Sequence, residues 1–297
     1  MQVEWMQGCA TALITPFRKD GSIDEDSFRL LVKRQIENGV KILVPCGTTG
    51  ESATMTEAER LHVIRICIEV AHKDKAKVIA GTGSNNTAAT IDFTRKVREL
   101  GADAALIVAP YYNKPSQEGL YAHFAEVARS VRDFPIVIYN VPGRTSCNIS
   151  AETTLRLAND FENIVATKEA SGNFSQIMQI CAFRPRGFKV FSGDDAITLP
   201  LISIGADGLV SVVSNEFPKE TSEMVEKALR GAWSSARRLH YKLLPLMEAN
   251  FIEPSPAPCK FVMSQMGLCE ENLRLPLVPI SEPSRKKIKE ILERIKL

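Results

Sequence analysis

The chain has 297 residues, of which 44% are hydrophobic and 24% are charged. This composition excludes an intrinsically disordered chain, and the length is sufficient for a large α/β domain with a substantial core. The formal net charge is only +2, from 37 basic and 35 acidic side chains, so the charge balance predicts no nucleic acid partner.

Neither targeting nor metal-binding patterns are present in the sequence. The N-terminal MQVEWMQG lacks a basic stretch followed by an apolar core, and uncharged runs such as 196–206 are too short to span a bilayer. We therefore expect no membrane partner and a cytoplasmic location. Seven scattered cysteines never form a CxxC pair, and none of the four histidines pairs with another at ligand spacing. We expect reduced thiols, no metal site and no cofactor.

Short β-type runs alternate with amphipathic helical windows through the first three quarters of the chain, which predicts parallel strands joined by helices. Eight strands are expected, at 9–14, 40–46, 77–81, 104–109, 135–140, 163–168, 188–192 and 208–213. Helices are expected at 26–37, 57–71, 87–99, 118–131, 151–159 and 174–183.

A weak internal repeat marks the joints between helices and strands. ENGVKILV, ELGADAALIV and SIGADGLVSV each place a glycine (Gly39, Gly101 and Gly205) where a helix would end in a left-handed residue. Eight such units favour an α/β fold of the closed (β/α)8 type, the TIM barrel. The rival is an open doubly wound sheet, but its glycine fingerprint is incomplete in GTGSNN at 81–86.

Beyond about residue 215 the strand pattern stops. The segments 217–250, 258–268 and 282–296 read as helical, with the proline-rich EPSPAP between the first two. We expect a barrel catalytic domain over 1–224 and a C-terminal helical extension over 225–297 packed on it.

Function in such a barrel lies at the carboxyl ends of the strands. The second strand is followed by CGTTGESA, in which Gly47 and Gly50 flank Thr48 and Thr49. Two hydroxyls with unhindered backbone N–H groups can hold a carboxylate in a small nest. The alternative is an ordinary turn into a helix with threonine caps.

Tyrosines follow the fourth and fifth strands. Tyr111 and Tyr112 must point in different directions, and the plain interpretation is one core and one surface side chain. Val137 and Tyr139 share a strand face, so the phenol of Tyr139 would stand at the mouth of the barrel.

Two further loops carry charge at the same end of the barrel. Pro142-Gly143 suits a type II turn that would project Arg144, a candidate fork for a carboxylate unless it is simply solvated. After the seventh strand, Asp194 or Asp195 is expected to cap a helix rather than act as an acid.

The sixth strand ends unexpectedly in a lysine. In IVATKEASG, Ile164, Ala166 and Lys168 share one strand face, which therefore carries an amine among apolar groups. Burial favours the neutral form of an amine, and a neutral amine is a nucleophile. Alternatively, Lys168 extends to solvent from the strand end. One chemistry uses the whole set: the lysine forms an imine with an α-keto acid, an anion nest holds the carboxylate, and tyrosine and threonine hydroxyls move protons.

These motifs together resemble the dihydrodipicolinate synthase family of pyruvate-dependent lyases and aldolases, and they occur in order along nearly the whole chain. The matching stretches are GTTGE at 47–51, PYYNKPSQEGLY at 110–121, YNVPGRT at 139–145, KEASG at 168–172, SGDD at 192–195 and GADGLVSV at 205–212.

The resemblance implies the catalytic roles. Lys168 would form the Schiff base with pyruvate, and Tyr139, Thr48 and Tyr112 would form a proton relay, with Tyr112 supplied by a second subunit. A dimer would then be the minimal active unit, and a dimer of dimers is the usual assembly of the family.

The resemblance also implies the substrates and their binding residues. Thr49 would bind the pyruvate carboxylate, with Gly193 and Val210 lining the pocket, and Arg144 would bind the carboxylate of L-aspartate 4-semialdehyde. Condensation and cyclisation would give 4-hydroxy-tetrahydrodipicolinate, on the diaminopimelate route to lysine.

One departure concerns feedback control. Lysine-inhibited relatives bind lysine through residues that match Ser52, Ala53, Glu57, Arg60, Asn85, Ala89 and Tyr111. Inhibited enzymes of enteric bacteria carry a histidine at the position of Glu57 and a glutamate at that of Ala89. Loss of this acid removes a partner for the ammonium group of the effector, so we expect weak or absent inhibition by lysine.

Three other functions are weighed against this one. A sister aldolase could use pyruvate with another aldehyde, such as N-acetylneuraminate lyase or a 2-keto-3-deoxy sugar acid lyase, but the first of these typically reads GSTGE and lacks Arg144. A phosphate-binding isomerase would show a glycine-rich grip after the seventh or eighth strand, and none is present. A non-catalytic paralogue would be expected to lose Lys168 or its tyrosines.

Overall fold

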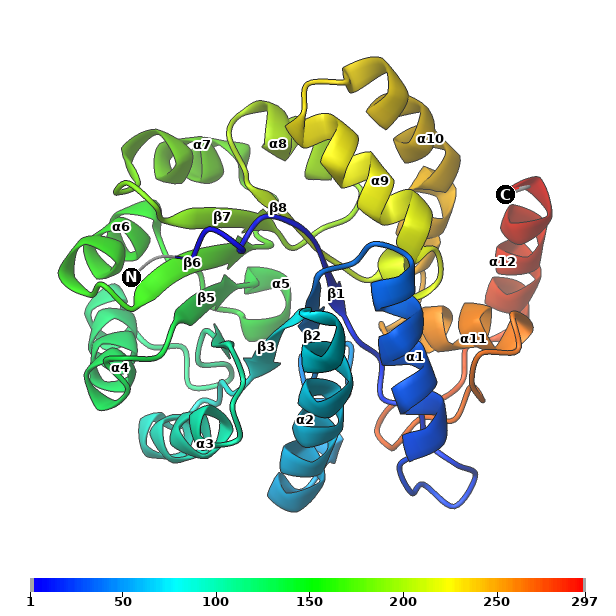
Figure 1. Cartoon of the computed structure of the whole chain (residues 1–297), viewed down its shortest axis with the longest axis horizontal. Coiled ribbons are helices and arrows are strands. Elements are labelled where there is room, and N and C mark those ends of the chain that lie inside the picture. The colour runs from blue at the N-terminus through cyan, green and yellow to red at the C-terminus, as the bar shows by residue number, and fades with distance from the viewer. Residues whose placement is uncertain (1–2, 296–297) are drawn as a thin grey trace.

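The computed structural model describes residues 3–295. Its strands form one closed, parallel barrel in chain order, surrounded by helices (Figure 1). The strands are β1 (Gly8–Ala12), β2 (Ile42–Val44), β3 (Lys77–Gly81), β4 (Ala104–Val108), β5 (Ile136–Asn140), β6 (Ile164–Glu169), β7 (Lys189–Ser192) and β8 (Gly208–Ser211). The barrel closes where β8 pairs with β1, with Gly208 opposite Gly8. The predicted (β/α)8 fold is confirmed.

The helices of the barrel lie between successive strands, as the alternation predicted. They are α1 (Glu25–Glu37), α2 (Glu57–Ala71), α3 (Thr87–Glu99), α4 (Gln117–Ser130), α5 (Pro142–Thr145), α6 (Ala151–Asp160), α7 (Phe174–Phe183) and α8 (Thr198–Ser203). Residues 3–295 also contain three short 3-10 helices: η1 (Ser52–Thr54), η2 (His72–Asp74) and η3 (Val213–Asn215).

Local sequence explains where these helices begin and end. Thr56 and Glu59 form a capping box at the start of α2, and the side chains of Asn86 and Ser116 cap α3 and α4. At the other end, Gly39, Gly101 and Gly205 follow α1, α3 and α8 with φ of +88°, +91° and +109°. Residues other than glycine rarely adopt this backbone conformation. The repeated glycine therefore forms the joint between helix and strand, as the sequence predicted.

The barrel separates two apolar layers. Inside it, side chains from every strand form a small cluster that includes Ala10, Ile42, Val44, Ile79, Leu106, Val137, Tyr139, Phe191 and Val210. A much larger cluster fills the space between the barrel and the helices. Side chains that point inward pack in the inner cluster, while the outer cluster packs the strands that carry them against the helices.

An irregularity in β6 breaks the simple alternation. Ile136 pairs with Ile164, but the next residue, Val137, pairs with Ala166, so Val165 is an extra residue on β6. Ile164 consequently packs in the outer cluster, and Val165 and Ala166 both belong to the inner one. The prediction that Ile164 shares a face with Lys168 is wrong. The extra residue shifts the in–out alternation of side chains by one position between Ile164 and Lys168.

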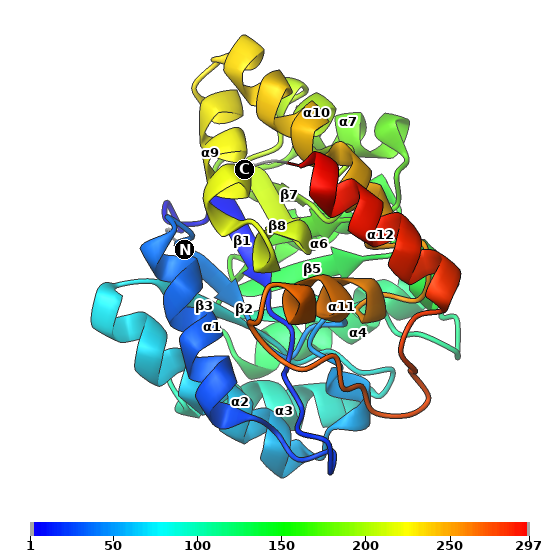
Figure 2. The same ribbon diagram turned by 90° about the vertical axis from the view of Figure 1, so that its right-hand side faces the viewer.

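As far as residue 295, where the description ends, the C-terminal part contains four helices: α9 (Pro218–Leu229), α10 (Trp233–Ala249), α11 (Ala257–Gln265) and α12 (Glu282–Arg294). The helical segment expected at 217–250 is thus two helices, which separate at Gly231, with φ of +77°. Figure 2 shows α11 and α12 on one side of the barrel. The expected domain boundary between residues 224 and 225 lies inside α9, which packs against β1 and α10.

The expected final helix at 282–296 extends one residue beyond the described part of the chain, so its last residue lies outside the described residues. Within residues 3–295, no helix combines the length and the apolar character needed to cross a membrane.

Candidate active site

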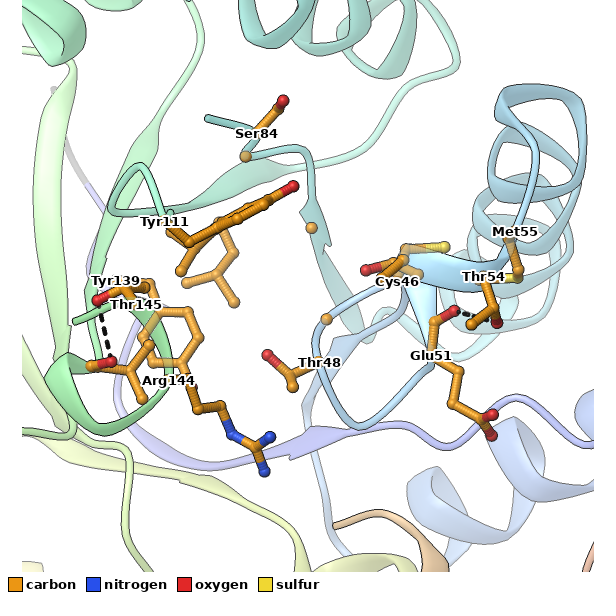
Figure 3. Close-up of a pocket in the computed structure, with 18 of the residues that line it drawn as sticks. Cys46, Thr48, Glu51, Thr54, Met55, Ser84, Tyr111, Tyr139, Arg144 and Thr145 are labelled. Carbon is orange, nitrogen blue, oxygen red and sulfur yellow. Dashed lines mark hydrogen bonds between the residues drawn. The ribbon is translucent and has the colours of Figure 1, made fainter. Parts of the chain in front are cut away.

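A cavity of about 550 Å³ opens at the carboxyl ends of β2 to β5. Its wall includes Thr48 from the loop after β2, Tyr139 from β5 and Arg144 from α5. Figure 3 shows these three side chains around one space, with Tyr111 on a neighbouring wall. The C-terminal part of the chain contributes residues such as Pro254 and Leu277. This is the end of the barrel at which the sequence predicted the chemistry.

Lys168 lies at the inner side of this site. It belongs to β6, is only 6% exposed, and its Nζ is 4.2 Å from the centre of the Tyr139 ring. Lys168 and Tyr139 are also register partners on neighbouring strands. Lys168 itself does not line the cavity, but Tyr139 does. The amine is therefore held among apolar groups beside a phenol, and it does not extend to bulk solvent.

Gly193, which follows β7, lies directly against this lysine. A Cβ atom added at Gly193 would lie 2.7 Å from Cβ of Ala170 and 3.0 Å from Cε of Lys168. The absence of a side chain at Gly193 thus leaves the space that Lys168 occupies. Val210 on β8 is buried in the same inner cluster as Tyr139.

The loop Gly47–Glu51 forms a tight turn beside the cavity. Its backbone closes where the N–H of Glu51 donates to the carbonyl of Thr48 over 3.0 Å. Thr15 donates to the carbonyl of Gly50 over 2.8 Å and ties the loop to the chain after β1. Thr48 is exposed toward the cavity, whereas Thr49 is buried and does not line it.

Arg144 reaches the cavity from a helical turn, so the predicted type II turn at Pro142-Gly143 is wrong. Pro142 occupies the first turn of α5, where a missing N–H costs nothing, and the carbonyl of Val141 accepts from Arg144 and Thr145 at 2.9 Å and 3.1 Å. The helical turn also points the Arg144 guanidinium into the open space (Figure 3).

Tyr112 is not brought into this site within one chain. Its side chain is 89% exposed, and its backbone has φ of +71°, a strained value for a tyrosine. The neighbouring Tyr111 is 40% exposed and lines the cavity.

Neither of the two aspartates after β7 caps α8 with its side chain, although a helix cap was predicted there. Asp194 accepts from the backbone N–H of Ala196, but Asp195 is buried and accepts from Ser211 and from the N–H groups of Val212 and Val213 at the start of η3. Burial raises the pKa of Asp195 to about 6. The side chain of Asp195 thus supports the segment after β8, and only its backbone carbonyl accepts from Thr198 at the start of α8.

Several buried polar residues of the site were missed by the sequence. Glu169, next to Lys168, is fully buried and accepts from Asn140 at 3.1 Å, Gln176 at 3.0 Å and the N–H of Ser171 at 2.9 Å. A charged residue at the end of an apolar strand is a signal that could have found it.

Glu51 was also missed as a site residue, as was its partner Lys260 on α11. Both side chains are completely buried, and they form an ion pair. The signal here is a lysine inside the apolar run APCKFVM of α11.

The positions expected to matter for lysine inhibition lie on α2, η1, α3 and the loops beside the cavity. Ser52, Ala53 and Arg60 line it together with Tyr111. The Arg60 guanidinium stacks 3.8 Å from the centre of the Phe93 ring and donates to the carbonyl of Gly81.

Two further positions of this set differ in their contacts. Glu57 pairs with Lys96 at 2.6 Å, and Lys96 also binds Asp92 at 2.7 Å. Ala89, near the start of α3, brings no charge to this region. The acidic side chain of Glu57 thus already has a cationic partner within the chain.

The chain is similar to known proteins of one family. The model of the dihydrodipicolinate synthetase family matches residues 5–295. The 4-hydroxy-tetrahydrodipicolinate synthase of Koribacter versatilis (strain Ellin345) is 52% identical over 287 residues, which cover 96% of this chain and 95% of that protein.

Solved structures agree with this match. Dihydrodipicolinate synthase from Aquifex aeolicus superposes with a TM-score of 0.95 at 43% identity, over 98% of this chain and 99% of that chain. The chloride-inhibited dihydrodipicolinate synthase from Acinetobacter baumannii, complexed with pyruvate, superposes with a TM-score of 0.95 at 40% identity, over 98% and 99% of the two chains. This protein therefore belongs to the dihydrodipicolinate synthetase family.

Proposed function

We propose that this protein is a 4-hydroxy-tetrahydrodipicolinate synthase, a Schiff-base-forming lyase of the diaminopimelate route to lysine. Its substrates are pyruvate and L-aspartate 4-semialdehyde. The observation that carries the proposal is the buried Lys168 amine beside the Tyr139 phenol, at the edge of a cavity that also holds Thr48 and Arg144. The relatives named above, two of them solved structures, support the same activity.

The first step joins pyruvate to the enzyme. The amine of Lys168 attacks the keto carbon, and loss of water leaves an imine. Lys168 is 6% exposed and lies beside Tyr139, a member of the apolar inner cluster, so its amine is held next to the reacting groups. Thr49 and the backbone of its loop bind the carboxylate, and Gly193 and Val210 line the space around the bound pyruvate.

The next steps require proton movement. Removal of a proton from the methyl group gives an enamine, whose carbon attacks the aldehyde of the second substrate. Tyr139 and Thr48 share one cavity and are suited to pass these protons, with Tyr112 as the third member of the relay. Arg144 binds the carboxylate of the semialdehyde, and attack by the substrate's own amine on the imine closes the ring and frees Lys168.

Tyr112 can serve in this relay only from another subunit, because within its own chain it is exposed and outside the cavity. We therefore infer a dimer as the active unit and a dimer of dimers as the assembly. We also place the enzyme in the cytoplasm. The support for this location is that all seven cysteines are free thiols, five of them buried.

The decisive experiment is reduction with borohydride in the presence of pyruvate, followed by peptide mass mapping. A pyruvyl adduct on Lys168 is expected, and Lys168→Ala should abolish it. Lys33→Ala, which changes an exposed lysine of α1, is the matched control and should keep the adduct. Absence of an adduct, or an adduct on another lysine, would contradict the proposal. Adding L-aspartate 4-semialdehyde and rival aldehydes then tests the second substrate.

A further inference from the structure

The ion pair between Glu51 and Lys260 joins the C-terminal extension to the loop that carries Thr48. Both side chains have no exposed surface. The Lys260 amine also donates to the carbonyl of Asn272 over 2.9 Å and lies 4.3 Å from the centre of the Phe17 ring. The stability of a buried ion pair depends strongly on the distance between its partners, because a buried charge that loses its partner has no water to solvate it.

A second contact from the extension reinforces the first. The other carboxylate oxygen of Glu51 accepts from the backbone N–H of Arg274 over 3.2 Å. The Arg274 guanidinium donates to the carbonyl of Thr54 over 3.0 Å and to both carboxylate oxygens of Glu59 at the start of α2. The extension thus holds the chain on both sides of η1.

The loop needs such support, because its backbone conformation is energetically unfavourable. Cys46 and Glu51, which flank the segment Gly47–Gly50, have φ of +56° and +53°, a left-handed conformation that non-glycine residues avoid. Such a conformation persists only where surrounding contacts hold it. In Figure 3 the Glu51 carboxylate points away from Thr48, so it can anchor the loop without entering the reaction.

We propose that Glu51 and Lys260 are positioning residues that hold the Thr48–Thr49 loop in its working geometry. This inference rests on the proposed function. It makes the extension a supporting part of the active site, because Lys260 lies on α11 and Arg274 follows it. Lys260 is not a second nucleophile, since its amine is committed to Glu51 and to the carbonyl of Asn272.

The test separates positioning from mere stability. Glu51→Gln keeps the shape of the side chain but removes its charge. It should lower kcat about tenfold or more, because Thr48 is displaced, and should raise the KM for pyruvate through Thr49. Borohydride trapping at saturating pyruvate should persist, because Lys168 belongs to β6. A lower melting temperature with unchanged kcat and KM would overturn the proposal.

A double variant makes the separation sharper. Glu51→Gln with Lys260→Met removes both buried charges, so stability should return toward that of the wild type. If the ion pair positions the loop, kcat should stay low in this double variant although the melting temperature recovers. Recovery of both would overturn the proposal, because charge compensation alone would then explain the pair.

One further variant completes the design. Arg285→Met breaks an ion pair with Glu271 that lies within the extension, and it should lower stability without changing kcat. If Glu51→Gln alone does not fold, the double variant replaces it, because it leaves no buried charge without a partner. Unchanged kcat in the double variant would overturn the inference. Failure of the wild type to trap pyruvate would instead reject the proposed function itself.

Discussion

Tyr139 and Lys168 are register partners on β5 and β6, and both side chains point into the barrel with only 6% of their surface exposed. The next pair along the same strands, Asn140 and Glu169, is hydrogen-bonded over 3.1 Å. The spacing between phenol and amine is therefore set by paired strands and by a buried bond directly after them. Sites built on strands are held more firmly than sites built on loops.

Gly193→Ala should impair the reaction at its first step. The added methyl group would lie 3.0 Å from Cε of Lys168 and 2.7 Å from Cβ of Ala170, so the lysine must move. We expect a loss of about a hundredfold in kcat/KM and in the rate of borohydride trapping, as for a reacting group displaced by about 1 Å. Gly143→Ala is the control, because its added methyl group meets nothing within 4 Å. Wild-type trapping in Gly193→Ala would contradict the close contact.

Arg144→Ala should separate the two substrates. Arg144 lies on α5 and lines the cavity, whereas Lys168 lies on β6 and does not line it. Pyruvate trapping should remain, and kcat/KM for the aldehyde should fall about a hundredfold through loss of a charged hydrogen bond. Arg144→Lys should recover part of this loss. An equal loss of trapping and turnover in Arg144→Ala would contradict the assigned role.

Mixed subunits should reveal the position of Tyr112. Lys168→Ala and Tyr112→Phe should each have little activity alone. After dissociation and remixing, a mixed dimer has one site with both Lys168 and Tyr112 intact if the tyrosine crosses the interface. Random pairing should then restore about a quarter of wild-type activity. No recovery, with mixed dimers verified by mass spectrometry, would show that Tyr112 does not act between subunits.

Lysine at millimolar concentration should leave turnover nearly unchanged. The region expected to bind it carries the cation Arg60, pairs Glu57 with Lys96, and has Ala89 in place of an acid. A lysine ammonium group would meet a positive charge there and no free acid at the position of Ala89. Initial rates with and without lysine at subsaturating pyruvate measure this, and strong inhibition would refute the expectation.

His123 should make the fold sensitive to mild acid. It is 5% exposed on α4, its Nδ1 lies 3.0 Å from the Thr87 hydroxyl, and burial lowers its pKa to about 4. The unfolded chain takes up this proton near pH 6.5, so stability should fall as the pH drops from 6.5 towards 4, by about 3 kcal/mol. Above pH 6.5 this group should have no effect.

Urea unfolding of the wild type and of His123→Gln at several pH values would measure this contribution. Burial also lowers the pKa of His240, but that residue is present in both proteins and cancels in the comparison. The stability difference between the two proteins should shrink below pH 6.5. Parallel pH curves would show that His123 does not carry the effect.

The fold could be predicted from the sequence because its signals are local and repeated. Gly39, Gly101 and Gly205 each mark a helix end, and the apolar strands between helices admit few architectures. The bulge at Val165 could not be predicted, because Ile164, Val165 and Ala166 are all apolar and fit either face. Pro142-Gly143 was likewise ambiguous, since a proline suits both a type II turn and the first turn of a helix.

The site was predictable where a functional residue lies near the carboxyl end of a strand. Tyr139 and Lys168 are the penultimate residues of β5 and β6, and the register of the two strands pairs them. The partnership of Glu51 with Lys260 was hidden, because the two lie in different parts of the chain and only tertiary packing joins them. Lys260 stands out locally as a lysine within an apolar run, but nothing in the sequence near it identifies Glu51 as its partner. Both side chains are completely buried, and local sequence does not reveal this burial. The burial is what distinguishes this ion pair from an ordinary surface pair.

The pairing of β1 with β8 has a consequence for how the protein is made. Gly8 finds its partner Gly208 only after roughly 200 further residues have been synthesised. Until then, one edge of β1 has no strand to pair with, and its free backbone groups can pair with another chain. The growing polypeptide thus remains open to misassociation until late in translation, and a product released from the ribosome before β8 is complete lacks the strand that closes the barrel.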